Sequence, residues 1–190
     1  IVAGPATPGG GTTVPMDFNW SAFGNNTNLA GGITQDTGGI NVGMTLTPGQ
    51  NFTAFTSQTG TTIYTAGGET FSTTSSGFLN RSNNGTATEL DITFTPVAGS
   101  GMADEVNNVQ FRISDIDEAT WKDRIVIKAY DADGNLIAVT ITESQADIAS
   151  TSSGTGATIE AVEGGANTDP NLIDGSVLVT IPGPVARIEI

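Results

Sequence analysis

The sequence predicts an all-β protein with a jelly-roll-like antiparallel β-sandwich. Apolar and polar residues alternate over many short segments, which is the pattern of half-buried strands. Residues typical of turns, above all Gly, Pro, Asn and Ser, separate these segments. No segment of the 190 residues keeps a 3.6-residue apolar period, so helices should be short or absent. No internal repeat of fixed period is visible, which argues against a propeller or a solenoid.

Taken in order, the chain begins with a Gly- and Pro-rich segment, residues 1–11, that we expect to be a linker or a loose arm. Residues 12–190 are expected to form one β-sandwich domain. The predicted strands cover residues 13–20, 40–47, 52–55, 61–64, 70–72, 78–79, 89–95, 109–114, 125–130, 157–162, 176–181 and 186–190, with one further strand ending at residue 139. Polar segments 24–39, 96–107, 146–156 and 163–174 are predicted loops. The length of loop 98–107 leaves open how the strands on either side of it pair.

Composition excludes several classes of function. The net charge is −14, from six Lys and Arg against twenty Asp and Glu, which disfavours nucleic acids and anionic membranes and favours cation binding. The chain has no Cys and therefore no disulfides. It has no His, which excludes Ser-His-Asp catalysis and disfavours a zinc site. No apolar run reaches the roughly 18 residues that membrane insertion needs.

Acidic residues are concentrated in the middle of the chain. The first 88 residues contain only Asp17, Asp36 and Glu69. Eight acids then fall within residues 104–133: Asp104, Glu105, Asp115, Asp117, Glu118, Asp123, Asp131 and Asp133. This contrast marks residues 104–133 as the candidate site.

Asp115, Asp117 and Asp123 are the first candidate calcium ligands. Residues i and i+2 of a strand share a face, so Asp115 and Asp117 should point the same way where the strand ends. Asp123, at the start of the next strand, should return to the same point. Adjacent carboxylates repel unless a cation lies between them, and calcium takes 6–8 oxygen ligands. The alternative is a solvated acidic loop whose charges pair with Lys122 and Arg124.

Asp131, Asp133 and Asn135 are further candidate ligands, in the sequence Asp-Ala-Asp-Gly-Asn. This run resembles the front of a calcium loop, but no Glu closes it at the EF-hand spacing. A hairpin turn is the preferred interpretation, of type I′, with its central pair at Asp133-Gly134 or Gly134-Asn135. Arg112 and Arg124 are expected to pair with acidic residues rather than to bind a ligand.

Few aromatic residues offer a flat face for a sugar ring. Trp20 is expected in the core beside Phe18. We name Trp121, in the acidic loop, and Tyr130 as candidate glycan-binding residues. The alternative for Trp121 is that it covers the core.

The run Asn108 to Asp117, Trp121, the run Asp123 to Asn135 and the closing segment Gly175 to Ile190 resemble β-sandwich modules of large secreted bacterial surface proteins. Such modules often accompany RTX-type calcium-binding repeats or C-terminal sorting signals. The resemblance covers residues 88–190 and implies a non-catalytic extracellular module on a secreted or surface-attached protein. Its partners would be neighbouring domains of a larger chain.

The expected function is therefore a calcium-stabilised binding module that attaches to a glycan or a cell-surface polysaccharide. Two alternatives are kept. One is a structural spacer with no ligand beyond the ion. The other is a polysaccharide-active enzyme, which would need a specific pair of carboxylates that the sequence does not single out.

Overall fold

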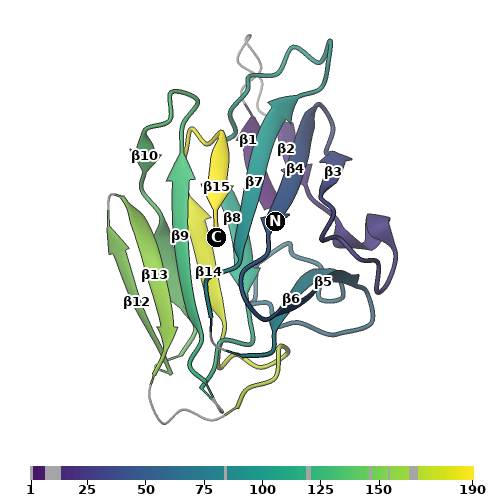
Figure 1. Cartoon of the computed structure of the whole chain (residues 1–190). Coiled ribbons are helices and arrows are strands. Elements are labelled where there is room, and N and C mark those ends of the chain that lie inside the picture. The colour runs from purple at the N-terminus through teal and green to yellow at the C-terminus, as the bar shows by residue number, and fades with distance from the viewer. Residues whose placement is uncertain are drawn as a thin grey trace.

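The computed structural model describes residues 2–6, 14–83, 85–118, 121–145, 147–153, 155–162 and 167–190. Two antiparallel sheets pack face to face, and a separate two-stranded ribbon lies beside one end of the sandwich (Figure 1). The antiparallel β-sandwich predicted from the alternation is confirmed. The jelly-roll order of its connections stays a prediction.

The first sheet has the strand order β11-β14-β8-β1-β2. Its strands are β11 (Thr140–Glu143), β14 (Val177–Ile181), β8 (Val109–Ile113), β1 (Val2–Ala6) and β2 (Val14–Asp17). The second sheet has the order β12-β13-β9-β15-β7-β4-β3, with β10 paired to β9. Its strands are β12 (Ile148–Ser153), β13 (Gly156–Ala161), β9 (Arg124–Tyr130), β15 (Arg187–Glu189), β7 (Glu89–Pro96), β4 (Ile40–Thr47), β3 (Ile33–Asp36) and β10 (Leu136–Ile137).

The ribbon consists of β5 (Phe52–Gln58) and β6 (Ser76–Arg81). One short 3-10 helix, η1 (Trp20–Phe23), packs against it. Within the described residues, no helix is long and apolar enough to cross a membrane.

The core lies between the two sheets and is built from the alternating positions of the strands. On β4, every second residue from Ile40 to Leu46 is buried, and β14 repeats the pattern from Val177 to Ile181. The largest fully buried side chains include Phe94, Ile92, Met44, Ile127, Ile159, Ile181 and Ile188. Burying a side chain of this size contributes about 1.5–3 kcal/mol, so the alternation itself fixes which face of each strand points inward.

Several predictions for the N-terminal half are wrong. Part of the expected arm, Val2–Ala6, is strand β1, which pairs with β2 and, through Val2 and Gln110, with β8. The other arm residues, 1 and 7–11, lie outside the described part. Residues 61–64 and 70–72 are not strands. The backbone N–H groups of Ile63 and Tyr64 donate instead to the carbonyls of Thr73 and Pro170 in two different loops.

Three strands formed where loops or no strand were predicted. These are β3, β11 and β12. In β12, the Ser150 hydroxyl donates to Glu143 and the Ser152 hydroxyl accepts from the Ile141 N–H, both on β11. Polar side chains therefore tie these two edge strands of different sheets together.

Loop 97–108 carries the chain from one sheet to the other. β7 belongs to the second sheet and β8 to the first, so the strands on either side of the loop do not pair with each other. The loop is held by reciprocal backbone hydrogen bonds between Val106 and Val185, of 2.9 and 2.8 Å. The acidic segment 114–123 makes the same kind of crossing, from β8 to β9.

Candidate metal centre

The acidic segment leaves β8 at Ile113 and is anchored by one buried side chain. Ile116 is 2% exposed, and its backbone N–H donates to the Gly175 carbonyl at 3.0 Å. Asp115 and Asp117 flank this anchor. They do not sit on a strand, because β8 has already ended and Asp115 adopts φ +69°. The predicted strand geometry of the two aspartates is therefore wrong.

Asp117 and Asp123 are locked to each other, so Asp123 does return to the same point as Asp117. The Asp123 N–H donates to the Asp117 carbonyl at 3.0 Å, and the Asp117 N–H donates to Asp123 Oδ2 at 3.2 Å. The Asp123 carbonyl then accepts from the Ala161 N–H at the end of β13. These bonds fix both side chains at the start of β9.

A fourth carboxylate comes from a distant loop. Asp169 acts electrostatically on Asp115, and its neighbour Thr168 donates its backbone N–H to Asp117 Oδ2 at 2.8 Å. Sequence reasoning missed Asp169, which it placed in an unremarkable polar loop. No local pattern could have revealed it, because the two loops are more than 50 positions apart.

The surroundings of Asp115 and Asp123 oppose the ionisation of these two carboxyl groups. Partial burial raises the pKa of Asp115, and repulsion from Asp117, Asp123 and Asp169 raises it further. Burial also raises the pKa of Asp123, as does the Asp117 charge, although the hydrogen bond from the Asp117 backbone N–H acts in the other direction. Removing the protons therefore costs free energy that a nearby cation would return.

Among the described residues, no Lys or Arg side chain provides this positive charge beside the aspartates. Lys122 and Arg124, the expected partners, both bind Glu160, at 3.4 and 2.8 Å. The other four basic residues are also engaged: Arg112 with Glu69, Lys128 with Glu189, Arg187 with Asp91 and Glu189, and Arg81 with the carbonyls of Gln50 and Thr86.

Buried oxygens near the acidic segment also lack partners. Among the described side chains, Glu118 Oε2, Asp147 Oδ1 and Thr168 Oγ1 are buried without a hydrogen bond. Buried polar atoms are normally paired with protein, water or an ion. Asp147 Oδ2 accepts from the Gly175 N–H at 2.7 Å, which places Asp147 at the same end of the sandwich as Ile116.

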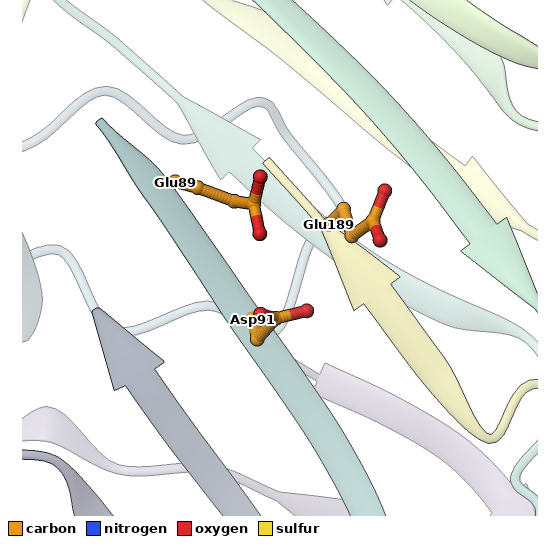
Figure 2. A group of neighbouring side chains, drawn as sticks. All are labelled: Glu89, Asp91 and Glu189. Carbon is orange, nitrogen blue, oxygen red and sulfur yellow. The ribbon is translucent and has the colours of Figure 1, made fainter. Parts of the chain in front are cut away.

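A second acidic group is more compact but already neutralised. Oxygens of Glu89, Asp91 and Glu189 all lie within 4.8 Å of one another, a spacing that the described residues of the acidic segment do not reach (Figure 2). Arg187 Nη1 lies 2.9 Å from Asp91 and 2.7 Å from Glu189. Because Arg187 already pairs with Asp91 and Glu189, two of the three carboxylates, we assign no metal to this group.

The neighbours of Glu189 in this second group lower its pKa. Burial would raise that pKa, but the hydrogen bond from the Tyr130 hydroxyl, at 2.7 Å, and the charges of Arg187 and Lys128 lower it overall. Glu189 is therefore stabilised as an anion by its own neighbours. In the acidic segment, Asp117 and Asp123 accept hydrogen bonds from backbone N–H groups, and no basic side chain in the described part of the chain pairs with them.

The run Asp131 to Asn135 is a hairpin turn, as the preferred interpretation predicted. The Gly134 N–H donates to the Asp131 carbonyl, and the Asn135 backbone and side-chain N–H groups donate to the two Asp131 carboxylate oxygens at 2.8 and 3.0 Å. Only Gly134 of this run has a positive φ, +81°, so the predicted type I′ turn is wrong. The hydrogen bonds from Asn135 lower the pKa of Asp131. The turn itself occupies the oxygens that a metal would need.

The two predicted sugar-binding aromatics differ in access. Trp121 is 41% exposed and lies within the acidic segment, between Asp117 and Asp123. The Arg187 guanidinium lies 4.3 Å from the centroid of the Tyr130 ring, and the Tyr130 hydroxyl is bound to Glu189. Trp121 therefore keeps an accessible face, whereas one face of Tyr130 is covered. Trp20 lies against the core at 4.8 Å from Phe18, centroid to centroid, as predicted.

A comparison with known protein families, with characterised proteins and with solved structures finds no significant match to this chain. The candidate site therefore rests on the residues and their geometry.

Proposed function

We propose that this chain is a non-catalytic, calcium-stabilised β-sandwich module of a secreted or surface-attached bacterial protein, which binds a glycan or a cell-surface polysaccharide. One observation carries the calcium part. The charges of Asp117, Asp123 and Asp169 act on Asp115, the pKa values of Asp115 and Asp123 are raised, and every basic side chain of the protein is engaged elsewhere.

Calcium suits this set of donors better than a softer metal. The side chains offer only oxygen, with no thiolate or imidazole anywhere in the sequence. Carboxylates from two loops would share the ion, and water would complete the 6–8 oxygens that calcium takes. An ion held this way would join segment 114–123 to segment 167–175 and close this end of the sandwich. At 100-fold excess over its dissociation constant, it would add about 2.7 kcal/mol of stability.

The binding part rests on Trp121. It is an exposed aromatic side chain two residues before Asp123, so an ion at Asp123 would order the segment that presents it. Aromatic rings with one accessible face and one polar end suit partly wet interfaces. A spacer module is the second candidate, and the covered ring of Tyr130 favours it.

Thermal melts test the calcium assignment. The wild-type chain should melt several degrees higher in calcium than in EDTA, and magnesium should produce less of the shift. Asp115→Asn should lose the calcium response. Asp133→Asn, in the hairpin turn, and Glu89→Gln, in the neutralised group, should keep it. A calcium response that Glu89→Gln abolishes and Asp115→Asn preserves would move the site to the second sheet.

Glycan binding is tested separately, on a polysaccharide and glycan panel in calcium. Wild-type protein should retain ligands that Trp121→Ala does not, while both proteins keep the same calcium-dependent melt. A blank panel together with an intact calcium response would favour the spacer.

A further inference from the structure

We propose that the free edge of β6 is a self-association surface, on which a second copy of this chain adds its own β6 in antiparallel register. This proposal is independent of the calcium site. It rests on the backbone edge, on the side chains that β6 presents and on the distribution of charge.

The β5–β6 ribbon has two strands, and residues 26–29 form backbone hydrogen bonds to the other edge of β5. Among the described strands, β6 pairs with β5 and with nothing else, so one side of β6 carries unpaired backbone groups. Gly77 through Asn80 are exposed on this strand. An open strand edge is a template for another strand.

The apolar side chains of β6 lie beside this edge. Phe78 is 36% exposed and Leu79 is 40% exposed. Leu79 is directly opposite the buried Phe55, so it shares the core-facing side of the ribbon, and Phe78 lies on the other side. Gly77 also lies on the Leu79 side, where the Trp20 ring takes the space of a side chain: a Cβ on Gly77 would lie 2.6 Å from that ring.

The strand complements itself. If two copies of β6 pair antiparallel about a two-fold axis, residues that lie opposite each other point to the same face of the sheet. The axis can therefore pass beside one residue of β6, which then lies opposite the same residue of the second copy. Centring it on Phe78 places the two Phe78 rings together and sets Leu79 opposite Gly77 of the second copy. Leu79 would then contact that copy's Trp20 ring, which lies over Gly77. Ser76 falls opposite Asn80, so polar residues also meet polar residues.

Charge favours this contact over others between two copies. Residues 37–88 contain one acid, Glu69, and one base, Arg81, so their charges cancel and the whole −14 lies elsewhere in the chain. Glu69 is in turn bound to Arg112. Two copies repel each other over most of their surfaces, but not across the ribbon. The occupant that fits an uncharged, self-complementary edge is a second copy.

Sedimentation velocity in EDTA tests the proposal over a range of protein concentrations, at low and high salt. We expect a concentration-dependent dimer that strengthens with salt, because salt screens the repulsion between the two acidic copies. Phe78→Lys and Leu79→Lys should abolish the dimer. Leu136→Lys is the matched control, since Leu136 is 41% exposed on β10, and it should dimerise like the wild type.

A cysteine pair tests the register, since the chain has no cysteine of its own. Ser76→Cys combined with Asn80→Cys should oxidise to a covalent dimer. The same pair cannot close within one copy, because four residues of a strand span about 13 Å. Ser76→Cys alone should not cross-link. A wild-type chain that stays monomeric in high salt overturns the proposal and leaves this edge to a strand of another protein. The proposal is also overturned if Leu136→Lys disrupts the dimer while Leu79→Lys leaves it intact.

Discussion

Arg112 and Glu69 form a part-buried bidentate ion pair that fastens a long loop to the sandwich. Arg112 Nε lies 2.6 Å from Glu69 Oε2 and Nη2 lies 2.7 Å from Oε1, with side chains that are 7% and 15% exposed. Nη1 donates to the hydroxyls of Ser144 and Ser176, and the guanidinium carbon lies 4.9 Å from the Tyr64 ring centroid. The pair joins β8 to segment 61–75, which has no strand of its own.

Glu69→Gln should destabilise the protein by about 3–5 kcal/mol, because it leaves the Arg112 charge buried without its partner. Glu160→Gln, which removes the exposed partner of Lys122 and Arg124, should cost at most about 1 kcal/mol. Urea unfolding of the two variants and the wild type measures both effects. Equal losses in the two variants would show that burial does not distinguish these pairs.

The same pair should make stability fall in acid. Burial would raise the pKa of Glu69, but the hydrogen bond and charge of Arg112 and the Ala66 N–H lower it below the ordinary 4.5. A lowered folded-state pKa gives stabilisation that is complete above the unfolded value and is lost as the pH falls through the folded value. The difference in unfolding free energy between wild type and Glu69→Gln should therefore be constant from pH 7 to about 5 and shrink below about 4.5. If this difference in unfolding free energy stayed unchanged down to pH 3, the ionised Glu69 would not be the source of the stabilisation.

Asp115→Asn should have opposite effects with and without calcium. The raised pKa of Asp115 means that its ionised form destabilises the folded state at neutral pH when no cation is present. In EDTA at pH 7 the variant should melt a few degrees above the wild type, and this advantage should shrink as the pH falls through the raised folded-state pKa of Asp115 and be gone below the ordinary value of 3.8. In calcium the order should reverse, because the variant has lost a ligand. Scanning calorimetry of both proteins in the two buffers measures the crossover.

Gly134→Ala should destabilise the β9–β10 turn by about 1–2 kcal/mol, since a Cβ is unfavourable at φ +81°. For a chain of this length, that corresponds to a fall in melting temperature of roughly 2–8 °C. Gly60→Ala is the control, because a Cβ at Gly60 meets nothing within 4 Å and its φ is not in the left-handed region. If the two variants have the same melting temperature, the positive φ at Gly134 does not contribute to stability.

The sequence by itself determined the sandwich and its main strands. The alternation in β4 and β7 marks their inner faces, because a one-residue shift would expose every apolar side chain. Asp-Gly-Asn marked the turn after β9, since those residues favour turns in any context. The charge contrast marked segment 114–123, where Asp117 and Asp123 do meet. Each of these features depends on residues close together in the chain.

Only the tertiary structure decided the rest. β12 pairs with β13 along its whole length although most of its side chains are polar, and its hydroxyls contact β11, so no apolar periodicity marks this strand. Asp169 joins the acidic segment, and Glu69 joins Arg112, across 43 or more positions of chain. Long-range partners of this kind depend on how the sheets stack and where the loops end, and local pattern carries no information about either. The free edge of β6 appeared for the same reason, since only the assembled fold shows which strands lack a neighbour.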